Sequence, residues 1–102
     1  MANEDFILLS SYPYNESNGV KRLYDPSPII VPLEGVSLVS YENVRCMRVG
    51  PNNKVKQPEK VRTVAVIYFK DGWGIKTQYL PGTVEDVYEK IRNRISNNIN
   101  NL

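Results

Sequence analysis

The stretch Val61–Leu80 constrains the fold of this chain more than any other. Two runs rich in β-branched and aromatic residues flank the dipeptide Asp71-Gly72. An Asp-Gly pair between such runs predicts a β-hairpin, because a type I′ turn needs positive φ at both central residues. The stretch therefore predicts two antiparallel strands joined by a two-residue loop.

A loop at Asp71-Gly72 also sets the register of the hairpin. It would place Lys70 opposite Trp73, and Phe69 opposite Gly74 on the other face of the sheet. Large residues on both faces of the first strand indicate that it is central in the sheet. We expect Trp73 and Tyr79 to share the face that packs in the core.

A helix is predicted over residues 83–99, after Pro81-Gly82 ends the sheet. Thr83 is a good N-cap residue, and Glu85 and Asp86 add negative charge to the first turn. One apolar stripe recurs at spacings of three and four: Val84, Val87, Tyr88, Ile91, Ile95, Ile99 and Leu102.

The remaining segments predict further strands and two loops. Residues 6–9 read as a short buried strand, and 36–49 as two strands or one long strand with a bulge. Residues 10–35 contain four prolines and three tyrosines and predict one long loop, with Ile29–Val31 as an edge strand within it. Residues 50–60 predict a polar loop. At 102 residues we expect a single domain of α+β class, with an antiparallel sheet of four or five strands and the C-terminal helix packed on it.

The composition limits the chemistry. The chain has no histidine and one cysteine, Cys46, so an internal disulfide is impossible and a zinc site has too few ligands. Without histidine to activate a nucleophile, we expect a protein that is not an enzyme and uses no cofactor or metal. No apolar run approaches a membrane span, and the acidic start lacks the pattern of a secretory signal, so we expect a cytoplasmic protein.

Charge is distributed unevenly along the chain. Residues 1–42 carry two cations against six acids, a net charge of −4, whereas residues 43–102 carry eleven against five, a net charge of +6. This asymmetry indicates two solvated surfaces, a basic face for an anionic partner, or opposite patches that meet in an oligomer. The total of +2 argues against tight non-specific binding of nucleic acid.

A ligand site is predicted where the helix meets the basic rim of the sheet, at a boundary between subunits. A phosphate-bearing ligand needs guanidinium donors and a flat apolar wall. The candidate residues are Arg45, Arg48, Arg62, Phe69, Lys76, Arg92 and Arg94. The alternatives are that these cations serve solubility and the helix dipole, and that the aromatic residues serve packing.

The order of an Asp-Gly hairpin followed by Thr-Val-Glu-Asp-Val-Tyr-Glu-Lys-Ile (83–91) resembles short flagellar swarming regulators. Several strands followed by one C-terminal helix are also similar to the first Thoeris anti-defence family of phage proteins, over residues 36–102. That second resemblance implies an oligomer that sequesters a cyclic ADP-ribose signal. Neither resemblance contains a motif that assigns a site residue.

We therefore expect a homo-oligomeric binding protein that sequesters a small anionic ligand of nucleotide type. The alternatives are an inhibitor that binds a host protein and a small regulator that binds nucleic acid. Self-association is expected because a sheet backed by one helix leaves its other face open, and we place Ile67 and Phe69 on that face.

Overall fold

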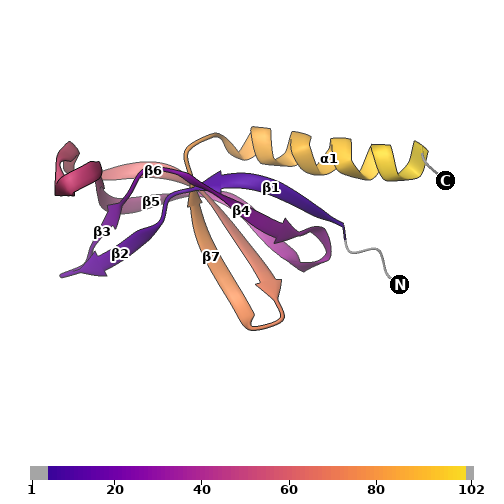
Figure 1. Ribbon diagram of the computed structural model, residues 1–102, viewed down its shortest axis with the longest axis horizontal. Helices are drawn as coiled ribbons and strands as arrows, with labels where there is room; N and C mark the ends of the chain where they lie inside the picture. Colours follow the sequence, from indigo (N-terminus) through magenta and orange to yellow (C-terminus); the bar gives the residue numbers. More distant parts are fainter. Residues whose placement is uncertain (1–4, 101–102) are drawn as a thin grey trace.

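The computed structural model describes residues 5–100, with side chains up to residue 96. These residues form strands and a C-terminal helix (Figure 1). The strands are β1 (Phe6–Ser11), β2 (Tyr14–Ser17), β3 (Val20–Leu23), β4 (Ser27–Pro32), β5 (Val36–Val49), β6 (Val55–Asp71) and β7 (Gly74–Leu80). Short 3-10 turns η1 (Leu33–Gly35) and η2 (Pro51–Asn53) flank β5, and the helix is α1 (Val84–Asn100).

The strands form two sheets. The larger has the order β2-β3-β5-β6-β7, and the smaller pairs β1 with β4. Every pairing is antiparallel except that of β3 with β5. The α+β class, the antiparallel-dominated sheet and the C-terminal helix are thus confirmed. Residues 36–49 form one long strand whose pairing with β6 shifts register at three points, which was the second of the two alternatives.

The β6–β7 hairpin forms, but its predicted register is wrong by two residues. Asp71 pairs with Gly74 and Lys70 with Ile75, so the turn is Gly72-Trp73. The Asp71 carboxylate accepts a hydrogen bond from the Trp73 amide at 2.7 Å, and Gly74 has a φ of 125°. Asp71 and Gly72 are not among the described residues with positive φ, so the type I′ turn predicted at this pair does not form; the positive φ falls instead at Gly74, just after the turn. Because the shift is even, the residues that remain paired in the two strands keep their predicted faces.

Trp73 was predicted at the start of the second strand, and the shift removes it from that strand. It lies in the turn and is 91% exposed, not packed in the core as expected. Tyr79, by contrast, is buried as predicted.

Residues 10–35 are not the long loop that was predicted. They contain the end of β1 and all of β2, β3 and β4. Asn18 and Gly19, with φ of 55° and 79°, make the turn between β2 and β3. Proline is tolerated in β4 because this strand lies in a two-stranded sheet, where it pairs only with β1. The predicted edge strand at Ile29–Val31 is confirmed as part of β4.

The predicted polar loop at 50–60 is also wrong in part. It contains η2, but β6 already begins at Val55, which pairs with Val49. Residues 51–60 are all exposed. Backbone pairing with β5, rather than burial of side chains, therefore makes this part a strand.

Two buried clusters lie on opposite faces of β6. Ala65, Ile67 and Phe69 pack with residues of β1, β4 and α1 on one face of the larger sheet. Val66 packs in a second cluster on the opposite face of this sheet. The second cluster contains Tyr12, Leu23, Val44, Cys46, Val66 and Tyr79. β6 is therefore central, as predicted. Ile67 and Phe69 are not on an open face, because β1, β4 and the helix cover them.

The helix packs as its apolar stripe predicts. Val84 and Val87 are buried and Ile91 is partly buried, whereas Tyr88 and Ile95 are about half exposed. Thr83 Oγ1 accepts a hydrogen bond from the Asp86 amide at 3.0 Å, which confirms Thr83 as the N-cap. The side chains of Ile99 and Leu102 lie outside those described. Figure 1 shows α1 running beside β1, with the β6–β7 hairpin extending from the opposite side of the molecule.

Candidate functional site: a groove between the helix and the small sheet

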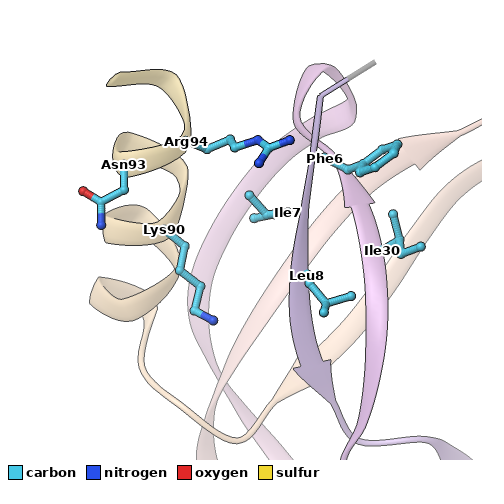
Figure 2. Close-up of a pocket in the computed structure, with 7 residues that line it drawn as sticks. All are labelled: Phe6, Ile7, Leu8, Ile30, Lys90, Asn93 and Arg94. Atoms are coloured by element: carbon cyan, nitrogen blue, oxygen red, sulfur yellow. The ribbon is translucent and has the colours of Figure 1, made fainter. Parts of the chain in front are cut away.

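A hollow on the described surface lies between α1 and the β1–β4 sheet (Figure 2). Its volume is about 550 Å³. It is lined by Phe6, Ile7, Leu8, Ile30, Lys90, Asn93 and Arg94. We call this hollow the groove.

Strand alternation supplies the apolar part of the groove. Along β1, Ile7 and Leu9 are buried in the core, so Phe6 and Leu8 face outward. Leu8 pairs with Ile30 of β4, and each of these two side chains is 61% exposed. Phe6 is 44% exposed. Phe6, Leu8 and Ile30 therefore form one exposed apolar patch.

The helix supplies positive charge. Lys90 and Arg94 are four residues apart, and therefore lie on the same side of α1. Figure 2 shows both side chains extending from α1 toward β1, with Asn93 farther from the strands. Within residues 5–96, neither cation has an acidic partner within ion-pairing distance. The two positive charges are thus free to meet an anion.

The predicted site residues are divided among several places. Arg94 lines the groove, but Arg92 lies about 200° around the helix from it and does not. Phe69 is 5% exposed within the core and cannot stack on a ligand. Lys76, paired with Phe69 across the hairpin, is exposed.

The three strand arginines also separate. Arg45 is exposed and forms an ion pair with Glu59 at 3.2 Å. Arg48 and Arg62 both line a second, smaller cavity. The structure therefore does not bring the seven predicted residues into one site.

Four residues that line the groove were not predicted as site residues: Phe6, Leu8, Ile30 and Lys90. The alternation of Phe6-Ile-Leu-Leu was a usable signal, since a strand with one buried face must expose every second residue. The position of Lys90 relative to β1 depends on tertiary packing alone.

The groove offers several kinds of non-covalent contact. Its lining residues offer an aromatic ring, aliphatic groups, an amide and two cations. They include no carboxylate, thiol or hydroxyl that could act as a base or nucleophile beside Lys90. Across the described part of the chain, no cluster of three Cys, Asp or Glu residues could hold a metal ion.

Comparison of the chain with protein-family models, curated proteins and solved structures finds no match. Within the described residues, the helix is too short and too polar to cross a bilayer.

Proposed function

We propose that this protein is a non-enzymatic binding protein that holds a small anionic ligand of nucleotide type in the groove. The observation that carries the proposal is the combination of an apolar wall with two unpaired cations. A nucleotide presents the complementary pair of features, a flat base and charged phosphate. A volume of about 550 Å³ suits such a ligand, since small-molecule sites usually span ~300–1,000 Å³.

The role that we propose is sequestration, in which binding without conversion lowers the free concentration of the ligand. The resemblance to phage anti-defence proteins stays a prediction. Within the proposal, Arg94 and Lys90 contact the phosphate, and Phe6 contacts the base or sugar. A guanidinium group suits phosphate because it can donate two parallel hydrogen bonds.

Titration calorimetry with AMP, cyclic AMP, cyclic ADP-ribose and uncharged adenosine tests this proposal. We expect the phosphate-bearing compounds to bind and adenosine to bind more weakly. Arg94→Gln should weaken binding about tenfold, since a hydrogen bond to a charged group is worth ~1.5–3 kcal/mol. Arg92→Gln is the matched control, because it removes the same charge from the same helix outside the groove.

Two results would contradict the proposal. One is the absence of binding for every phosphate compound. The other is an equal loss of affinity in the Arg94 and Arg92 variants, which would indicate a general effect of charge.

A protein partner is the second candidate function. The exposed pair Leu8 and Ile30, beside Phe6, favours it, since a protein could cover these side chains more fully than a small ligand. This partner could be a host protein or a second copy of the chain.

A further inference from the structure

A second cavity, of about 150 Å³, lies between the paired strands β5 and β6 and the connection from β7 to α1. Its polar lining includes Arg48 of β5, Arg62 of β6, Gln57 and Thr63, and its apolar lining includes Tyr12 and Leu80. Val44, Cys46 and Arg48 are every second residue of β5 and therefore share one face of that strand. Arg62 of β6 pairs with Val44 and lies on the same face. Strand geometry therefore places both guanidinium groups on one side of the sheet.

Contacts within the protein hold both arginines in place. Arg62 Nη1 donates a hydrogen bond of 2.8 Å to the Cys46 carbonyl oxygen. The Arg48 guanidinium carbon lies 4.9 Å from the centre of the Tyr12 ring, a cation–π contact. Arginines that are already positioned lose less conformational entropy when a ligand binds.

The positive charge around this cavity is only partly compensated. Asp25 is the acid nearest to Arg48, at 3.7 Å from Nη2, but it lies closer to Lys56, at 2.8 Å from Nζ. If Lys56 and Asp25 neutralise one another, the charges of Arg48 and Arg62 remain. No acid among the described residues pairs with Arg62.

Arg48 also has an unsatisfied donor. Its Nε is buried and has no hydrogen-bond acceptor in the described part of the chain. Buried donors nearly always have an acceptor, and one without an acceptor destabilises the folded state. The Arg48 side chain lines the cavity, so an anion seated there would lie near its guanidinium group, although Nε itself is closed to solvent.

We propose that this cavity binds a phosphate group, and that Arg48 and Arg62 are the residues that contact it. A phosphate dianion balances two guanidinium charges, whereas a carboxylate balances one. The small volume admits a phosphate group but not a nucleoside, so any larger part of the ligand extends out of the cavity. This site is separate from the groove and does not depend on the function proposed for it.

The test is an NMR titration of the full chain with inorganic phosphate, against sodium chloride of matched ionic strength. We expect phosphate to shift the Nε–H resonances of Arg48 and Arg62, and chloride to leave them in place. Arg48→Gln and Arg62→Gln should each weaken phosphate binding about tenfold, as expected for loss of a charge-assisted hydrogen bond. Arg62→Lys, which keeps the charge but loses the planar fork, should weaken it less.

Arg45→Gln is the control, because Arg45 lies on β5 but is exposed and does not line the cavity. The proposal is overturned if phosphate causes no shifts beyond those of chloride, or if Arg45→Gln weakens binding as much as Arg62→Gln. A parallel titration with AMP, followed at the Nε–H resonances of Arg48 and Arg62, identifies the source of the phosphate group. Tighter binding of AMP supports a phosphate ester as ligand, and tighter binding of inorganic phosphate supports the free anion. The Nε–H resonances of Arg48 and Arg62 report on this cavity alone, because neither residue lines the groove, and this separates the two sites.

Discussion

At the scale of single residues, Tyr68 shows how a neighbouring carboxylate changes a side chain. Its hydroxyl donates a short hydrogen bond to Glu42 Oε2, which joins β6 to β5. This bond, with a smaller contribution from burial, raises the pKa of Tyr68 from 10.0 to about 12. The cause is that ionised Tyr68 would lose its donor proton and face the negative charge of Glu42.

The raised pKa predicts that stability depends on pH in the alkaline range. Between pH 10.0 and about 12, folded Tyr68 keeps a proton that the unfolded chain loses. The contribution of this proton to the free energy of unfolding is therefore complete below pH 10.0 and declines as pH rises toward 12. Urea denaturation across this pH range should show that the free energy of unfolding declines as pH rises. The decline should be smaller in Tyr68→Phe.

The ionisation of Tyr68 itself can be measured from the absorbance of tyrosinate. Subtracting the pH titration of Tyr68→Phe from that of the parent isolates Tyr68 from the other tyrosines. Glu42→Gln should lower the Tyr68 midpoint toward its ordinary value, since it removes the negative charge. An unchanged midpoint in Glu42→Gln would contradict the assigned cause.

At the scale of elements, the start of α1 is held by reciprocal capping and by contacts with β5. Thr83 Oγ1 accepts from the Asp86 amide, and Asp86 Oδ2 accepts from the Thr83 amide at 3.3 Å. Tyr41 of β5 donates to Glu85 at 2.7 Å and accepts from the Val84 amide at 3.1 Å. The first turn is thus attached to the sheet, which sets the position of Lys90 and Arg94 relative to β1.

Removal of the cap should destabilise the protein without changing its fold. Thr83→Ala leaves the Asp86 amide without its side-chain acceptor, and loss of such a cap costs ~0.5–2 kcal/mol. The measurement is the free energy of unfolding by urea, with far-ultraviolet circular dichroism as the probe of helix. Thr83→Ser keeps the hydroxyl, so it should retain most of the stability. Equal losses in the two variants would show that the hydroxyl is not the stabilising group.

At the scale of the whole molecule, the chain is elongated. Its radius of gyration is 15.2 Å, compared with ~13 Å for a compact domain of 100 residues. The surface expected to drive self-association is buried, but Phe6, Leu8 and Ile30 form another apolar surface at the groove. The predicted homo-oligomer would therefore use this surface, and would place the groove at a subunit boundary.

Light scattering tests this prediction. We expect a mass that is a multiple of the 11.7 kDa chain, and a shift toward the single-chain mass in Leu8→Asp. Ile75→Asp is the control, because Ile75 is 72% exposed on the β6–β7 hairpin, outside the groove. A single-chain mass for the parent at high concentration would contradict self-association.

The sequence by itself determined those features that depend on neighbouring residues. The α1 helix follows from its apolar period and the Thr83 cap, both of which act within a few residues. The faces of β6 and β7 follow from strand alternation, which an even shift of register leaves unchanged. The α+β class follows from these two elements together.

Only the tertiary structure decided the register, the strands within 10–35 and the sites. The residues from Asp71 to Gly74 are compatible with more than one turn position. Strand pairing along the whole hairpin determines which of these turns forms. β4 is a strand because β1 pairs with it, and its own prolines argue against one. The groove exists because α1 packs beside β1, far away in the chain, and the second cavity because Arg48 and Arg62 meet across two strands. Such contacts depend on chain closure over long sequence separations, which no local pattern specifies.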